Sequence, residues 1–447
     1  MEQAIQQTGI RKGLTKLVIP IFIETLLIMM LGAVDTVMLS QYSDESVAAV
    51  GVVNQIVMFA FLIFEVINIG TYVLCSQYLG AGMRNKMVQV VGVSLLLNLV
   101  VGLVVSAILH YGATTLLGWM GLRPELLKYG IGYMEIVGAF AFFQAISLTI
   151  SASLRSANKA IYPMLVTVLV NVMNIIGNYS LIFGKFGFPQ LGIAGAAIGS
   201  SLAELVSVIF FIIYTWKRID CKKYALNILP KFQSRTLKRI LNVSVWTMIQ
   251  NFVSLSTWFM FFLFVEHLGE RSLAIANIIR NVSGIPFMIA MAFAATCGSL
   301  VSNLIGAGEK DCVRGTINQH IRIGYVFVLP ILIFFCLFPD LILRIYTDMP
   351  DLRDASIPSL WVLCAAYVVL VPANVYFQSV SGTGNTRTAL AMELCVLTIY
   401  VAYATYFILY LKMDIAFAWT TESVYGIFIL LFCYWYMKKG NWQKKKI

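Results

Sequence analysis

Seven acidic residues of this 447-residue chain lie within long apolar stretches. A charged carboxylate in such surroundings is costly unless it has a partner, so each acidic residue is a candidate for handling ions or protons. Asp35 is the strongest candidate, because it follows the apolar run 26–34 and lies about one helical turn before the end of its stretch. The seven residues are Glu24, Asp35, Glu65, Glu135, Glu204, Glu393 and Glu422.

Glu24 shares an apolar stretch with Asp35. The two residues are eleven positions apart, which on a helix places them about three turns apart on nearly the same face. Two carboxylates at different depths on one face could pass a proton or a cation across a membrane. The alternatives are a neutral Asp35 that only joins helices by hydrogen bonds, and a Glu24 that only reaches the cytoplasmic interface.

Polar residues in other stretches could complete such a site. Asn171, Asn174 and Asn178 are spaced by three and four residues and therefore share one helix face. The plain alternative for this row is hydrogen bonding between helices. We expect Glu135 near the outer interface and Glu204 against a polar linker, where both carry less information. Further candidates for a cavity or relay lie in the second apolar stretch: Asn54, Gln55, Glu65 and Asn68.

The second half of the chain carries a different set of charges. Arg280 is the only basic residue deep within an apolar stretch, and a buried guanidinium needs a partner. We expect that partner to be Glu422 or Glu393. The pair would be a structural lock, or a switch if it opens during the working cycle. The predicted polar cluster of this half consists of Arg280, Asn374, Gln378, Glu393 and Glu422.

Membrane-spanning helices must position these residues. The chain is 60% hydrophobic and only 12% charged, with a mean hydropathy of +0.83, which a water-soluble domain of this length does not show. Its runs are continuously apolar rather than alternating, which predicts helices and not a β-barrel. About twelve stretches are long enough to cross the bilayer. They span roughly 17–39, 51–76, 88–110, 130–152, 161–184, 192–215, 241–265, 274–301, 321–343, 357–380, 389–411 and 415–437.

An internal repeat organises these stretches. The segment Ser76–Gly82 returns as Ser302–Gly308, an offset of 226 residues (306 against 80 for the matching glycine). The repeat predicts an all-α integral membrane protein with two six-helix lobes, related by a pseudo-twofold axis along the membrane normal. By the same offset Asp35 maps to Phe261, so the second lobe lacks this carboxylate. The predicted boundaries are an N-lobe at 1–216, a cytoplasmic linker at 217–239 and a C-lobe at 240–447.

The net charge of +11 is a membrane-topology signal. With both termini cytoplasmic, 23 Lys and Arg fall near the cytoplasmic face and 7 near the other face. Because this asymmetry accounts for the charge, we expect no nucleic-acid partner. The eight cysteines show no C-x-x-C spacing, which argues against metal or disulfide roles.

Several motifs occur in a specific order along the whole chain: Pro20 with Val34–Thr36, Gly80–Gly82, Leu154–Asn158, the row of Asn171, Asn174 and Asn178, and Leu191–Ile198. In this order they resemble the multidrug and toxic compound extrusion (MATE) family, in its bacterial NorM/DinF-like type. The resemblance implies a cation-coupled antiporter that exports amphipathic, often cationic, organic compounds by alternating access of two lobes. It further implies a monomer in the bacterial cytoplasmic (inner) membrane, with a small organic substrate and no cofactor.

The resemblance also implies a set of site residues. In similar proteins the aspartate of the first helix shares a polar site with residues of the fifth and sixth helices, which match Asn174, Asn178 and Ser200 here. Several relatives have an acidic residue where this chain has Asn178. The coupling ion therefore stays open between H⁺ and Na⁺, and Na⁺ at Asp35 would be the only metal. One carboxylate with neutral oxygens could hold Na⁺, and the same carboxylate could carry a proton.

Two other functions compete with antiport. A lipid or lipid-linked precursor flippase of the same superfamily is the rival within transport, although that branch usually carries extra helices. A membrane-embedded enzyme is the rival from another class, but the three histidines lie far apart in the sequence near the ends of apolar stretches. The chain has no Walker A pattern, so it carries no ATPase motor of that type.

Overall fold

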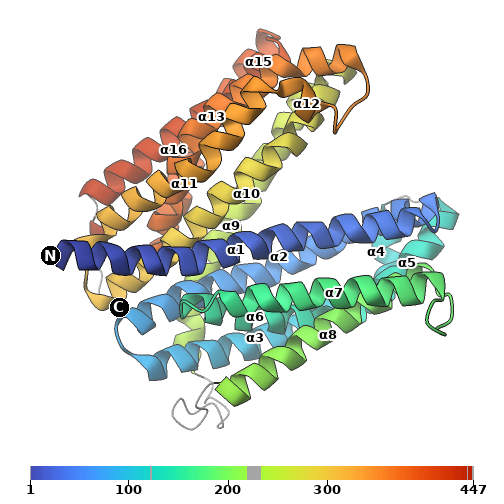
Figure 1. Cartoon of the computed structure of the whole chain (residues 1–447), viewed down its shortest axis with the longest axis horizontal. Coiled ribbons are helices and arrows are strands. Elements are labelled where there is room, and N and C mark those ends of the chain that lie inside the picture. Colours follow the sequence, from blue (N-terminus) through green and yellow to red (C-terminus); the bar gives the residue numbers. More distant parts are fainter. Residues whose placement is uncertain (1, 121–122, 219–232, 440, 445–447) are drawn as a thin grey trace. The chain divides into compact units, whose positions relative to one another are not determined.

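The computed structural model describes residues 2–120, 123–218, 233–439 and 441–444 (Figure 1). Within these ranges every regular element is a helix. Eleven helices are long and apolar enough to cross a membrane, and two further helices joined by a 46° bend make a twelfth span. The bent pair is α5 (Pro124–Ala139) with α6 (Ala141–Ser156), which together cover the predicted fourth stretch. The predicted all-α, twelve-helix membrane fold is confirmed.

The helices belong to two compact units of the chain. Unit 1 comprises Met1–Leu79 and Met83–Ser244, and unit 2 comprises Gly80–Gly82 and Val245–Ile447. The division falls inside α9 (Ser234–Glu266). Most of the predicted linker 217–239 lies outside the described residues, so the lobe boundaries stay a prediction.

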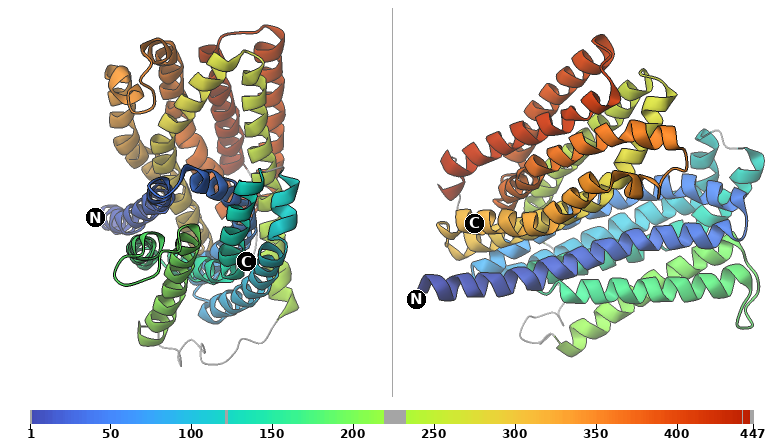
Figure 2. Two further views of the ribbon diagram at one scale, coloured as in Figure 1. Left: turned by 90° about the vertical axis from the view of Figure 1, so that its right-hand side faces the viewer. Right: turned by 45° about the horizontal axis from the view of Figure 1, so that its top comes forward.

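Unit 1 places three helices around Asp35. In this unit α1 packs on α7, and α7 packs on α8 along much of its length (Figures 1 and 2). Glycines allow the second contact, since a Cβ on Gly177 would lie 3.2 Å from the Cα of Gly199. Small residues permit such close approach of membrane helices. Besides α5 and α6, the helices of the unit are α1 (Glu2–Ser40), α2 (Asp44–Gly80), α3 (Arg84–Tyr111), α4 (Ala113–Trp119), α7 (Ile161–Phe183) and α8 (Ile193–Arg218).

Unit 2 is built around α10 and α13. In each of these helices 67% of the most apolar window is buried, against 22–33% for the other spans that lie wholly in the unit or, like α9, cross its boundary. The remaining helices surround this pair and leave large apolar side chains exposed, as expected for surfaces in contact with lipid. The elements that follow α9 are α10 (Glu270–Ala307), α11 (Cys312–Leu337), α12 (Pro339–Leu343), α13 (Pro350–Gly382), α14 (Thr386–Ala404), a π-helical turn η1 (Thr405–Tyr410), α15 (Ile415–Ala418), α16 (Thr420–Lys439) and η2 (Asn441–Lys444).

Candidate functional site

Asp35 lies at the end of a hydrogen-bonded chain of four polar side chains. Asn178 Nδ2 donates to Asp35 Oδ1 at 2.6 Å and to Asn174 Oδ1 at 3.1 Å. Asn174 Nδ2 in turn donates to Ser200 Oγ at 2.9 Å. The chain links α1, α7 and α8, and both asparagine side chains are fully buried. All four residues that the sequence assigned to a cation or proton site are therefore in one connected cluster, which we call the Asp35 cluster.

The helix packing next to this cluster depends on Gly199. A Cβ at that position would lie 2.5 Å from Asn178 Oδ1 and 3.1 Å from the Asn178 backbone nitrogen. Real Cβ atoms do not approach other atoms so closely, so only glycine lets α8 contact α7 at this level. The absence of a side chain at Gly199 thus determines how closely α8 approaches Asn178.

Two features of the Asp35 cluster were not found from the sequence. The buried Asn178 Oδ1 has no hydrogen-bond partner among the described residues, so an acceptor oxygen stands free beside the carboxylate. Tyr133 of α5, which is 5% exposed, interacts electrostatically with Asp35. A tyrosine in an apolar stretch gives no sequence signal that distinguishes it from a packing residue.

Glu24 has a partner that the sequence did not predict. Arg155 Nη2 donates to Glu24 Oε1 at 2.5 Å, and the glutamate is 3% exposed. Arg155 also interacts electrostatically with Glu65 and Tyr72. This ion pair joins α1 to the C-terminal end of α6. It gives Glu24 a structural role that does not require a relay to Asp35, which lies eleven residues further along α1.

Of the remaining predicted relay residues, one is buried in a hydrogen-bonded network and three are exposed. Asn68 is 5% exposed and accepts at 2.9 Å from Asn98 Nδ2, which also donates to Thr149 Oγ1 at 2.7 Å. This is a buried link between α2, α3 and α6. Asn54, Gln55 and Glu65 are exposed, and no hydrogen bond within the described residues connects them to Asp35.

Glu204 takes part in a polar contact between α6 and α8. It is half-buried within unit 1, where Ser207 Oγ donates to Glu204 Oε2 at 3.4 Å. The amide nitrogen of Gln144, when oriented to donate, lies 2.7 Å from both carboxylate oxygens. Most of the linker against which Glu204 was expected to pack lies outside the described residues, so that contact stays a prediction.

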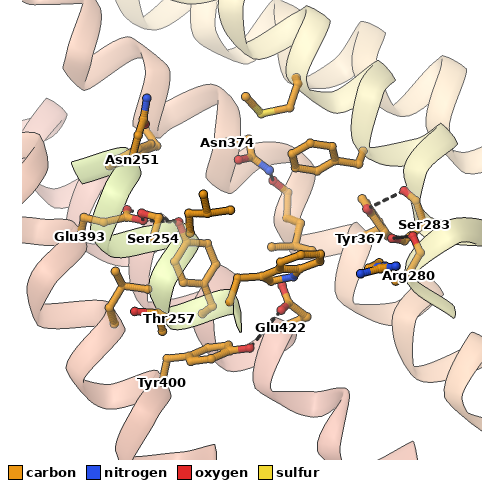
Figure 3. A pocket seen from close by; sticks show the side chains of 18 of the residues that line it. Asn251, Ser254, Thr257, Arg280, Ser283, Tyr367, Asn374, Glu393, Tyr400 and Glu422 are labelled. Atoms are coloured by element: carbon orange, nitrogen blue, oxygen red, sulfur yellow. Dashed lines mark hydrogen bonds between the residues drawn. The ribbon is translucent and has the colours of Figure 1, made fainter. Parts of the chain in front are cut away.

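Unit 2 contains a cavity of about 570 Å³ (Figure 3). Side chains from α9, α10, α13, α14 and α16, with Trp419 between α15 and α16, form its wall. The wall combines large aromatic residues with amides, hydroxyls and three charged groups. All five members of the predicted polar cluster line it: Arg280, Asn374, Gln378, Glu393 and Glu422.

Hydroxyl groups hold the two glutamates of the cavity. Glu393, 2% exposed, accepts from Ser254 Oγ at 2.7 Å and from Tyr425 OH at 3.0 Å. Glu422 accepts from Tyr400 OH at 3.3 Å. The sequence nominated both carboxylates but not these three hydroxyl donors, since tyrosine and serine are too common in membrane helices to stand out.

The expected ion pair of Arg280 is not formed. The ion pairs between described residues do not include Arg280, so pairing with Glu422 or Glu393 was wrong for this structure. The guanidinium instead lies 5.8 Å from the ring centre of Trp258 and 5.3 Å from that of Phe262. Cation–π contacts of this kind replace the carboxylate that the sequence led us to expect.

The two halves of the chain match one family model separately. The MatE family model matches residues 20–180 and again residues 247–406, together most of the chain. The chain belongs to the MatE family. The two matched segments start 227 residues apart (20 and 247) and end 226 apart (180 and 406), which confirms the internal repeat.

Relatives of this MatE chain cover nearly its whole length. It is 29% identical over 405 residues to the uncharacterized transporter YisQ of Bacillus subtilis (strain 168), covering 88% of each chain. It is 27% identical over 441 residues to the probable multidrug resistance protein NorM of Thermotoga maritima, covering 98% of this chain and 94% of the relative. The solved structure of a MOP superfamily transporter from Pyrococcus furiosus has the same fold, with a TM-score of 0.86, 19% identity and coverage of 98% and 97%. MatE proteins are membrane transporters and not enzymes, which removes the enzyme alternative.

The repeat allows equivalent positions in the two MatE halves to be compared. Phe261, the counterpart of Asp35, is 1% exposed and packs against Trp419 with ring centres 5.2 Å apart. Gln250, the counterpart of Glu24, lines the cavity of unit 2. A packed aromatic residue in unit 2 therefore occupies the position that the carboxylate of Asp35 has in unit 1.

Proposed function

We propose that this MatE chain is a secondary active antiporter that exports amphipathic or cationic organic compounds in exchange for H⁺ or Na⁺ by alternating access. One observation carries the proposal: the chain of hydrogen bonds from Asp35 through Asn178 and Asn174 to Ser200. A single carboxylate with only neutral partners can take up and release one monovalent cation. The Asn178 amide donates one hydrogen bond that orients the carboxylate, and Asn174 and Ser200 hold that amide in turn.

The relatives support export of organic compounds. Several are named multidrug resistance proteins, including those of Thermotoga maritima and Photobacterium profundum. The reported relatives do not favour the flippase alternative. A cavity that mixes aromatic, amide and charged side chains suits compounds with an apolar body and a polar group.

The two coupling ions make different demands on the Asp35 cluster. Protonation of Asp35 needs no further ligand. Na⁺ would need several oxygen ligands, for which Asn178 Oδ1 stands free and Asn174 Oδ1 and Ser200 Oγ are close by.

Positive charge supports the proposed orientation. The excess of Lys and Arg on one set of loops favours cytoplasmic termini in a bacterial inner membrane, with the linker 217–239 on the same side. In that orientation Asp35 faces the outer half of the bilayer, because it precedes the end of α1 at Ser40 by five residues.

Accumulation of a fluorescent cationic dye tests the proposal. Cells that express the chain are expected to retain less dye than control cells, and an ionophore that collapses the ion gradient should abolish the difference. Asp35→Asn should raise dye retention to the control level while the protein remains folded and membrane-inserted. The matched control is Asp348→Asn, which makes the same carboxylate-to-amide change at an exposed residue. Full, ionophore-sensitive export by Asp35→Asn would refute the assignment.

A further inference from the structure

We infer that the cavity of unit 2 binds amphipathic compounds that carry an acidic group, a carboxylate, sulfonate or phosphate, and that Arg280 selects them. This inference rests on the proposed function and names a substrate class for it. In this cavity, protein hydroxyl groups donate hydrogen bonds to both glutamates, whereas no described protein group accepts a hydrogen bond from the side chain of Arg280.

Arg280 has no protein acceptor for its hydrogen bonds. A guanidinium carries five N–H donors in a planar fork. Among the described residues, its side chain interacts only with the rings of Trp258 and Phe262. It belongs to the cavity wall and is only half-buried, so the donors remain accessible from the cavity.

The aromatic contacts decide how this fork can be used. Aromatic rings do not take up the N–H donors of the fork as a carboxylate would, so those donors remain for an acceptor group. Carboxylates, sulfonates and phosphates match that fork with two parallel hydrogen bonds. Trp258 also lines the cavity, so a flat apolar body attached to the acidic group would find an aromatic surface beside Arg280.

The glutamates are arranged so that they do not neutralise Arg280. Ser254 and Tyr425 hold Glu393, and Tyr400 holds Glu422. Figure 3 shows Arg280 beside Tyr367 and Ser283, at the opposite side of the view from Glu393. A ligand acid at Arg280 therefore does not have to displace a protein carboxylate.

Equilibrium binding to the purified full-length chain tests the inference without any ion gradient. The probes are 2-naphthoate, its neutral analogue 2-naphthamide and the cation 2-naphthylmethylammonium, measured by isothermal titration calorimetry in one detergent. We expect 2-naphthoate to bind at least about tenfold more tightly than 2-naphthamide, as for a hydrogen bond to a charged group. Equal affinity, tighter binding of the ammonium probe, or no detectable binding of 2-naphthoate would overturn the inference.

Variants of Arg280 test whether this residue causes the preference for 2-naphthoate. Arg280→Met should abolish the preference for 2-naphthoate, and Arg280→Lys should keep only part of it because the fork is lost. Arg322→Met, the same change at an exposed arginine outside the cavity, should bind like the unmodified protein. If Arg280→Met does not fold, the comparison of probes on the unmodified protein and on Arg280→Lys still decides. A preference that survives intact in both Arg280 variants would overturn the role of Arg280.

The outcomes separate this inference from the proposed function. Asp35→Asn should still prefer 2-naphthoate over 2-naphthamide, because Arg280 belongs to unit 2 and Asp35 to unit 1. Export that fails while the naphthoate preference persists would contradict the antiporter and leave the inference standing. Gradient-driven export of cationic dyes without any naphthoate preference would support the antiporter and overturn this inference.

Discussion

Replacing Gly199 by alanine should damage the Asp35 cluster although it removes no polar group. The new Cβ would lie 2.5 Å from Asn178 Oδ1, 3.1 Å from the Asn178 nitrogen and 3.2 Å from the carbonyl carbon of Gly177. Two of these atoms belong to the backbone, which cannot rotate away, so α7 and α8 must separate by several tenths of an ångström. Overpacking of this kind costs about 1–3 kcal/mol. The separation should also lengthen the 2.9 Å hydrogen bond from Asn174 to Ser200.

Thermal unfolding in detergent and dye export together measure this effect. We expect Gly199→Ala to lower the unfolding temperature and to reduce export per folded molecule. The matched control is Gly51→Ala on α2, where an added Cβ meets nothing within 4 Å. That change should be neutral or should stabilise by about 0.5–1 kcal/mol, because alanine is the better helix former. Stability and export of Gly199→Ala equal to those of Gly51→Ala would refute the account of how the helices position Asn178.

Two further substitutions probe buried polar links. Arg155→Met leaves Glu24 buried without its partner and should lower the free energy of unfolding by about 3 kcal/mol. This is the lower end of the usual range, because the arginine side chain is 30% exposed. Unchanged thermal stability would contradict a structural role for the pair. Asn98→Ala removes two interhelical hydrogen bonds, worth about 0.6 kcal/mol each on average in membrane proteins. It should lower the unfolding temperature slightly and leave export per folded molecule unchanged, whereas lost export at full stability would contradict this expectation.

The sequence predicts the fold of this chain well, because the bilayer imposes simple rules. Continuous apolar stretches must form helices to satisfy their backbone groups, and the repeat at 226 residues divides them into two halves. The bend between α5 and α6 was not predicted, since Phe140 lies within an unbroken apolar stretch and nothing in it marks a break. The Asp35 cluster could be anticipated because helix spacing puts Asn174 and Asn178 on one face, and because the family resemblance groups them and Ser200 with Asp35.

The partners of charged side chains were the feature that the sequence predicted least well. Arg155 was counted only among the 23 basic residues near the cytoplasmic face, yet from α6 it pairs with Glu24 on α1. Arg280 was assigned a carboxylate, yet its side chain contacts two aromatic rings and forms no ion pair among the described residues. Long flexible side chains choose among several partners within reach, and helix periodicity does not rank those partners. Pairing therefore depends on the depth and rotation of each helix, which only the folded structure provides.

Substrate exchange in proteoliposomes tests the central claim most directly. The purified chain is reconstituted, a pH gradient or a Na⁺ gradient is imposed separately, and uptake of a labelled organic cation is followed against the gradient. The account predicts that one of the two gradients drives accumulation by the unmodified protein and by Asp348→Asn, and that neither drives it with Asp35→Asn. Gradient-driven accumulation by Asp35→Asn at the unmodified rate would contradict the account.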